Sequence, residues 1–263
     1  MAAAHVPGAD PAPTLSRGKA FAIHLSISAL VATIVGSAMY FVWYPDPLFE
    51  AMGGNELVMI LIGVDVVVGP IVTLIIFNPS KGRRTLRLDL SMIAAAQAAA
   101  LAYGIYIVAE ARPVYVVFSV DRFDVVAANE LFDEDLAKVK RPEFRTVPWG
   151  RPPVIAVEMP SDPEEQLSVI TWAASGQDLQ VFPQHYRPYA ELAPLALKRA
   201  KPLADLRRRH AAEAAAIDAA LARLGRRIED TAYLPLKARN RDMTVLLDAK
   251  TGAVAGYAKV NPW

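Results

Sequence analysis

The side chains that most often carry catalysis or bind metals are few and scattered in this 263-residue sequence. It contains no cysteine, and its four histidines are His5, His24, His185 and His210. No two of them stand three or four residues apart, the spacing that places two ligands on one helix face. The lack of cysteine excludes thiolate metal sites and thiol nucleophiles, and no phosphate-binding glycine loop or G-x-S-x-G motif occurs. We therefore expect no catalytic residue, no metal site and no cofactor.

One carboxyl group stands out because of its surroundings. Asp65 is the only formally charged residue in the apolar stretch 57–77. A carboxyl inside a membrane costs at least a few kcal/mol unless it is neutral or has a partner. Asp65 could bind a partner or handle a proton. Alternatively it is a protonated structural residue, bonded to His24, Gln97 or Tyr103 on a neighbouring helix.

Asp65 does not predict an intramembrane aspartyl peptidase. Such an enzyme needs a second carboxylate close enough to share a proton. The nearest candidate for a second intramembrane carboxylate is Asp89, which follows a run of basic residues and is expected at the membrane surface. The partner-binding, proton-handling and structural interpretations of Asp65 therefore all stay open.

Small and helix-bending residues indicate where a partner could bind. Pro70 follows Asp65 by five residues and should distort the helix, and Gly69 precedes it. A second helix carries small residues at every fourth position, which permits close helix approach. The candidate partner-binding residues within the membrane are therefore Asp65, Gly69, Pro70, Ala96, Ala100 and Gly104. The alternative for the small residues is packing among the chain's own helices.

These residues lie in three apolar stretches, 20–44, 57–77 and 90–109, of 25, 21 and 20 residues. A helix of about 20 residues crosses a hydrocarbon core. We predict three transmembrane helices, although buried globular helices are the alternative. The first is too long for a signal-peptide core of about 7–15 residues. It also ends in an aromatic belt, Phe41, Trp43 and Tyr44.

Basic residues predict the orientation of these helices. The loop between the first two helices has three acids and no Lys or Arg. Basic residues instead stand before the first helix and in the loop between the second and third: Arg17, Lys19, Lys81, Arg83, Arg84 and Arg87. Because positive loops stay inside, the N-terminus should be cytoplasmic. The region after residue 110 should then be periplasmic, in a bacterial inner membrane.

Composition agrees with a membrane-anchored α+β protein. The chain is 54% hydrophobic, above the ~45–50% of soluble domains. Its net charge of +1 gives no reason to expect nucleic acid as a partner. We expect a disordered cytoplasmic N-terminus (1–18), a three-helix transmembrane module (19–110) and a periplasmic α+β domain with a small, mostly antiparallel sheet (111–263).

The C-terminal domain, residues 111–263, shows strand and helix signals that do not alternate regularly enough for a doubly wound sheet. Strands are predicted at 114–120, 123–128 and 154–159, and the proline-rich stretch 141–153 should be irregular. A helix should open at Ser161 or Asp162 and stop at Gly176. An apolar stripe from Leu203 to Ile228 indicates helix, and residues 243–260 predict a hairpin with Gly252 in its turn.

Several motifs, in order, resemble the TfpX/TfpZ family of type IV pilin accessory proteins. The resemblance covers residues 17–130 well and the rest loosely. It rests on the stretches RGKAF (17–21), FVWYP (41–45), FEAMGG (49–54), GVDVVVGP (63–70), AYG (102–104), ARPVYVVF (111–118) and DRF (121–123). The 248–263 hairpin also fits.

The resemblance implies an inner-membrane accessory protein that helps a major pilin to accumulate or assemble into surface pili, in a chaperone-like manner. It implies no cofactor and no reaction. The expected partners are the bilayer and a type IV major pilin, through both its transmembrane helix and its periplasmic head. Such a pilin is anchored by one hydrophobic N-terminal helix, which carries a buried acidic residue near its charged amine.

Two other functions remain open. One is a membrane enzyme that modifies pilin, although the acids of residues 45–56 are sparse for such a site. The other is a membrane-tethered periplasmic sensor, although only about nineteen residues would face the cytoplasm at the N-terminus.

Overall fold

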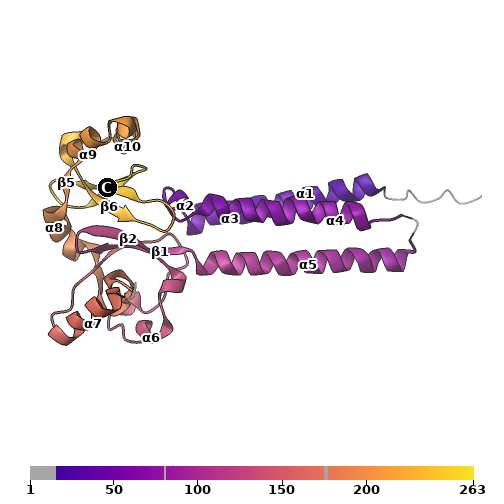
Figure 1. Cartoon of the computed structure of the whole chain (residues 1–263), viewed down its shortest axis with the longest axis horizontal. Helices are drawn as coiled ribbons and strands as arrows, with labels where there is room; N and C mark the ends of the chain where they lie inside the picture. The colour runs from indigo at the N-terminus through magenta and orange to yellow at the C-terminus, as the bar shows by residue number, and fades with distance from the viewer. Residues whose placement is uncertain (1–15, 80, 175–176) are drawn as a thin grey trace, which may run out of the picture. The chain divides into compact units, whose positions relative to one another are not determined.

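A computed structural model of the chain describes residues 16–79, 81–174 and 177–263 (Figure 1). The chain divides into two compact units. One comprises the described residues up to Gly36 together with Val58–Ile105, and the other comprises Ser37–Leu57 together with Tyr106–Trp263. The disorder predicted for the N-terminus falls largely on residues 1–15, outside the described residues.

Three helices in the described residues are long and apolar enough to span a membrane, which confirms the predicted number. They run over Arg17–Trp43, Gly54–Ile76 and Arg84–Glu110. The first joins α1 (Arg17–Ala38) to the π-helical η1 (Met39–Trp43), and the second joins α3 (Gly54–Leu61), η2 (Ile62–Val68) and α4 (Gly69–Ile76). The third lies within α5 (Arg83–Glu110), one uninterrupted helix in Figure 1.

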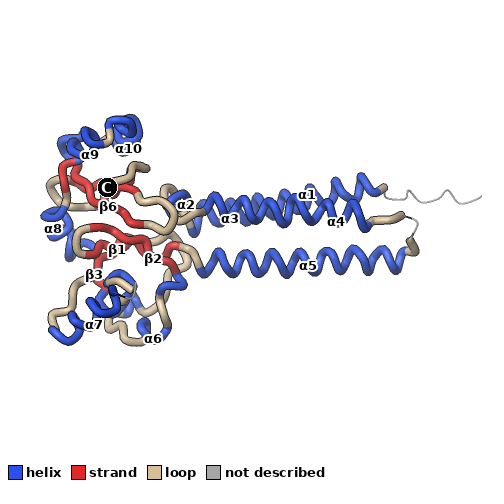
Figure 2. Tube along the Cα trace, in the orientation of Figure 1, coloured by secondary structure: helices blue, strands red, loops and turns tan. Residues whose placement is uncertain are grey.

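The described part of the C-terminal domain contains an eight-stranded, mostly antiparallel sheet, which confirms the predicted α+β class (Figure 2). The strand order is β4-β3-β1-β2-β6-β7-β8, with β5 beside β6. Only the pairs β1–β3 and β2–β6 are parallel. The strands are β1 (Pro113–Ser119), β2 (Arg122–Ala127), β3 (Val154–Val157), β4 (Tyr186–Pro188), β5 (Lys201–Pro202), β6 (Thr231–Lys237), β7 (Met243–Asp248) and β8 (Val254–Ala258).

The sheet is larger than expected because β4, β5 and β6 gave no clear strand signal. Pro235 lies inside β6, and a proline argues against a central strand. The pairing explains its tolerance. Residues 232 and 233 pair with β5 and residues 236 and 237 pair with β2, so Pro235 falls between these two neighbours.

Short helices surround the sheet. They are α2 (Leu48–Ala51), α6 (Asp133–Leu136), α7 (Pro163–Ala174), α8 (Tyr189–Arg199), α9 (Leu203–Arg209) and α10 (Ala214–Leu224). Asp162 caps α7 as predicted, because its Oδ1 accepts the backbone N–H groups of Glu164 and Glu165 at 2.8 and 3.0 Å. The expected stop at Gly176 lies outside the described residues.

The apolar stripe after Pro202 belongs to two helices. The chain leaves helical geometry at His210, where φ is −110° and ψ is 57°, so α9 and α10 are separate. Their apolar residues still converge on one core with β6 to β8, which includes Leu203, Leu206, Ile217, Leu221, Tyr233 and Leu246. The periodicity therefore located the buried face correctly and missed the break.

The C-terminal hairpin of β7 and β8 is confirmed, and its turn depends on Gly252. This residue has φ of +73°, and a Cβ atom there would lie 2.4 Å from the carbonyl oxygen of Ala193 in α8. Only glycine satisfies both the left-handed backbone and the close approach. The turn is thereby fitted against α8.

Candidate functional site

The helical segment that contains Asp65 is not regular α-helix. Asp65 lies in η2, a π-helical stretch, and the N–H of Gly69 bonds to the carbonyl of Val64. Pro70 follows at once and has no N–H to donate to the preceding turn. Wide helical turns of this kind occur mostly as short insertions, often at functional sites. The distortion predicted beside Asp65 is thus present.

Asp65 lies on an inward face of its helix together with Gly69 and Thr73, all three buried. Thr73 Oγ1 is hydrogen-bonded to Nδ1 of His24 in α1 at 2.6 Å. A Cβ atom at Gly69 would lie 1.7 Å from Nε2 of Gln97 in α5, so this glycine permits the close contact. The face is therefore packed against the two other spanning helices.

The carboxyl group of Asp65 has no hydrogen bond or ion pair within the part of the chain that the structure describes. His24 bonds to Thr73, Gln97 lies against Gly69, and Tyr103 is largely exposed. None of the three structural partners considered for Asp65 contacts it by a hydrogen bond. A buried polar group without a partner is costly in a membrane, so Asp65 remains a candidate for binding another molecule.

The other candidate residues differ in exposure. Pro70 is buried with Gly69, whereas Ala96 and Ala100 in α5 are exposed and Gly104 is half-buried. A Cβ atom at Gly104 would meet nothing within 4 Å. The small-residue side of α5 is therefore open in this chain.

The loop between the first two spanning helices packs against the C-terminal domain. Leu48, Ala51 and Met52 of this loop are buried. The carbonyl oxygen of Ala51 accepts the backbone N–H groups of Asn240 and Arg241 at 2.9 and 3.1 Å. Residues 45–57, which we call the docked loop, thus join the turn between β6 and β7 by main-chain hydrogen bonds.

Ion pairs surround this backbone contact. Lys259 Nζ lies 2.7 Å from Asp46 Oδ1 and 3.2 Å from Glu50 Oε2, and Arg241 also pairs with Glu50. Burial tends to raise the pKa of Glu50, but hydrogen bonds from Lys259 and Arg241 lower it overall. The hydrogen bond to Asp46 raises the pKa of Lys259. The contact is therefore charged at neutral pH.

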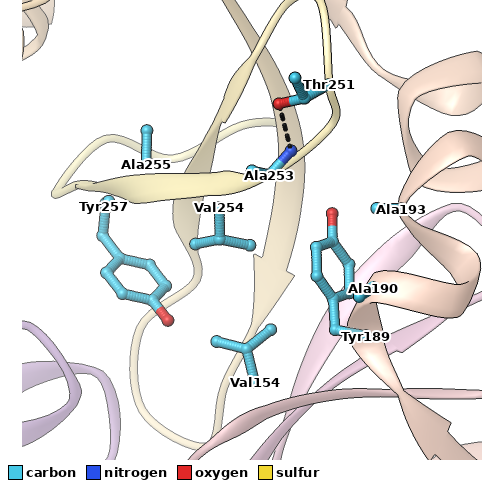
Figure 3. Close-up of a pocket in the computed structure, with 10 residues that line it drawn as sticks. Val154, Tyr189, Ala190, Ala193, Thr251, Ala253, Val254, Ala255 and Tyr257 are labelled. Atoms are coloured by element: carbon cyan, nitrogen blue, oxygen red, sulfur yellow. Dashed lines mark hydrogen bonds between the residues drawn. The ribbon is translucent and has the colours of Figure 1, made fainter.

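A groove in the C-terminal domain offers a second binding surface (Figure 3). It has a volume of about 680 Å³, and its lining includes Val154, Tyr189, Ala193, Val254 and Tyr257. A second hollow of about 560 Å³ shares Val154, Tyr189 and Ala190 with it. The edge strand β8 forms one wall, and its residues Val254 to Tyr257 are only half-buried.

The chemistry of this groove is that of binding. Tyr189 Oη donates a hydrogen bond to the carbonyl oxygen of Gly252 at 2.6 Å. Burial raises the pKa of Tyr189, and it raises the pKa of Tyr257 to about 12. Both phenols therefore stay neutral, Tyr189 is a hydrogen-bond donor, and the rest of the lining is largely apolar. In the described residues no group of three or more His, Asp or Glu could hold a metal ion.

Sequence reasoning found the acids of the docked loop but missed their partners. The acids of this loop entered the argument through the loop's lack of positive charge and as too sparse for an enzyme site. Arg241 and Lys259, the partners of Asp46 and Glu50, lie about 200 residues further along the chain. The sequence signal that could have joined them is the predicted topology, in which the docked loop and the C-terminal domain lie on the same side of the membrane.

Comparison with known proteins identifies the family to which this chain is similar. The model of the family "Fimbrial assembly protein FimB" matches residues 13–53, which include α1 and most of the docked loop. A fimbrial assembly protein of serogroup I from Dichelobacter nodosus is 32% identical over 236 residues, 89% of this chain and 91% of the relative. The serogroup E1 protein of that organism is 31% identical over the same shares.

A third relative from Dichelobacter nodosus, the fimbrial assembly protein of serogroups C1 and C2, is 35% identical over 122 residues. That match covers 46% of this chain and 93% of the relative. No solved structure matches the chain. Because the similarity to two relatives extends over most of both sequences, the chain belongs to the fimbrial assembly protein FimB family.

Proposed function

We propose that this protein is a bacterial inner-membrane accessory protein that supports the stability or assembly of a type IV major pilin, in a chaperone-like and non-catalytic manner. The observation that carries the proposal is similarity over 89% of the chain to a relative named as a fimbrial assembly protein. The resemblance to TfpX/TfpZ proteins adds the pilin as the expected client. Three helices able to span a membrane support a location in the membrane, where pilin subunits would reside before assembly.

The proposed orientation has the N-terminus in the cytoplasm and the C-terminal domain in the periplasm. The docked loop supports this arrangement, because Ala51 and Asn240 can bond only if both lie on the same side of the membrane. Two spanning helices separate them in the chain, which returns the chain to that side. The acidic loop and the basic stretch 81–87 supply the direction.

Within the membrane, we assign the pilin helix to the open side of α5. Ala96, Ala100 and Gly104 would let a second helix approach closely. Asp65 would supply a carboxyl to polar atoms that the pilin helix otherwise leaves unpaired in lipid. Its lack of a partner within the described residues supports this role.

In the periplasm, the groove between β8 and α8 is the proposed contact for the pilin head. An extended segment could add to the free edge of β8 by main-chain hydrogen bonds. Val154, Val254 and the neutral phenols of Tyr189 and Tyr257 would receive its side chains. This contact would give selectivity among pilins.

The test is a quantitative immunoblot of the major pilin of the same bacterium, in strains with and without this gene. Both the total pilin and the pilin sheared from the cell surface are measured. Loss of surface pilin that the gene restores in trans supports the proposal. A parallel fall of the total pool assigns protection of the subunit, and a normal pool assigns assembly. Unchanged pilin in both fractions refutes the function.

The variant Asp65→Asn tests the intramembrane site in the same assay. We expect less surface pilin at an unchanged level of this protein. Asp89→Asn is the matched control, since Asp89 already pairs with Lys81 at 2.5 Å. If Asp65→Asn removes the protein itself, Asp65 is structural, and normal piliation removes the proposed role.

A further inference from the structure

An exposed tryptophan of the C-terminal domain lies beside the end of the first spanning helix. The ring centroids of Trp149 and Trp43 are 6.5 Å apart, and Trp43 is the last residue of that helix. Trp149 is 66% exposed and stands in the irregular stretch before β3, followed by exposed Gly150 and Arg151. These contacts all fall within the second compact unit.

The same tryptophan is tied to the end of the third spanning helix. The guanidinium carbon of Arg112 lies 4.0 Å from the centroid of the Trp149 ring. Arg112 also donates hydrogen bonds to the carbonyl oxygens of Ala109, in the last turn of α5, and Pro148. Arg112 is itself buried, so the guanidinium is a fixed support for the indole.

The ends of the first and third helices are joined directly as well. Tyr44 Oη donates a hydrogen bond to the carbonyl oxygen of Val108 at 3.0 Å, and Tyr44 is fully buried. Tyr44 follows the first helix immediately, and Val108 lies near the end of the third. The ends of the first and third spanning helices therefore lie at the same level as Trp149. The residues at this level are Trp43, Tyr44, Val108 and Trp149.

Tryptophan favours this level of a membrane, because its ring is mostly apolar and its N–H needs a polar partner. We infer that the segment Pro148 to Arg151, which we call the anchor loop, lies in the headgroup region of the bilayer, with Trp149 as its interfacial anchor. Arg151, exposed beside it, faces the phosphates of that layer. The C-terminal domain thus contacts the membrane surface through a loop of its own, in addition to the helices that attach it.

The occupant is lipid because the surface of Trp149 continues the aromatic belt of a spanning helix. The anchor loop is separate from the candidate pilin sites, so the inference does not depend on the proposed function. The inference predicts that brominated lipid quenches the fluorescence of Trp149.

The experiment uses the full chain in nanodiscs that contain brominated phosphatidylcholine. The chain has four tryptophans, Trp43, Trp149, Trp172 and Trp263, and single-tryptophan variants with the other three changed to Phe isolate each. Trp43 is the positive control. Trp172 in α7 is the matched negative control, since it is also exposed, at 49%.

Loss of Trp149 emission to an extent similar to that of Trp43, with Trp172 unaffected, supports the inference. An unquenched Trp149 overturns it. Equal quenching of Trp149 and Trp172 also overturns it, because the contact would not be specific to the anchor loop. Emission that only added pilin shifts would assign the loop to pilin instead.

A second readout covers variants that fail to fold. The chain has no cysteine, so Trp149→Cys and Trp172→Cys each give one labelling site with the other tryptophans kept. A nitroxide at position 149 should be more accessible to oxygen and less accessible to a water-soluble nickel chelate than one at 172. Equal accessibility at both positions refutes the anchor loop.

Discussion

Removing the carboxylate of Glu50 should loosen the docked loop by a measurable amount. Glu50 pairs with Arg241 and Lys259, and its side chain is 28% exposed. Pairs near a surface contribute about 0.2–1 kcal/mol each, so two pairs on one carboxylate should contribute on the order of 1 kcal/mol. The variant Glu50→Ala should therefore open the docked loop about fivefold more often, since 1.4 kcal/mol corresponds to tenfold.

Hydrogen exchange measures this opening directly. The N–H groups of Asn240 and Arg241 both bond to the carbonyl oxygen of Ala51, so they exchange when the docked loop leaves. We expect about fivefold faster exchange in a peptide that covers them in Glu50→Ala. Glu56→Ala is the control, because Glu56 makes only a 3.4 Å hydrogen bond with Asn240. Unchanged exchange in Glu50→Ala would refute the view that these ion pairs hold the loop.

Two further predictions concern stability of the C-terminal domain. Gly252→Ala should lower the unfolding midpoint in detergent more than Gly225→Ala, because both have positive φ but only Gly252 also lacks space for Cβ. Burial raises the pKa of Asp124 from 3.8 to about 6, opposed by Arg122. The stabilising contribution of protonated Asp124 is then fully present below pH 3.8 and is lost as the pH rises through about 6. Asp124→Asn should flatten the dependence of the unfolding midpoint over that interval.

Local patterns predicted much of the fold. The spanning helices can be predicted from the length of continuous apolar stretches, because that length is a property of the sequence and does not depend on tertiary contacts. The strands 113–119 and 243–248 are rich in β-branched and large apolar residues and buried along almost their whole length. The turn at Gly252 follows from the backbone conformation that only glycine adopts easily. In each case the cause lies within a few residues of the effect.

The parts that were missed depend on pairing between distant segments. β5 has only two residues, and it is a strand because Lys201 and Pro202 pair with Tyr233 and Ala232. β6 contains Pro235, which is tolerated because it lies between the residues that pair with β5 and those that pair with β2. Neither property is visible in the segment itself. The apolar spacing has a gap around His210 and Glu213, but it was interpreted as part of one stripe, because the apolar residues on both sides still meet in one core.

The candidate site likewise has one part that a local signal predicted and one part that depends on tertiary contacts. Asp65 could be found from sequence because a charge in an apolar run is anomalous by itself. That Gly69 is covered by Gln97 could not be found, since it requires knowing how α4 and α5 approach each other. The structure adds that Ala96 and Ala100 of α5 are exposed and that Gly104 is half-buried, and these residues remain the proposed contact for a partner helix.

The docked loop shows how topology can constrain contacts before any pairing is known. In the proposed topology, a loop between the first and second spanning helices and a domain after the third lie on the same side of the membrane, so their charges can meet. The docked loop carries acids and no Lys or Arg, and Arg241 and Lys259 of the C-terminal domain face it. The lack of positive charge that indicates the proposed orientation thus also leaves the loop complementary to the domain beside it. One feature of the sequence therefore has two physical consequences, and the exchange experiment on Glu50 measures the second independently of the first.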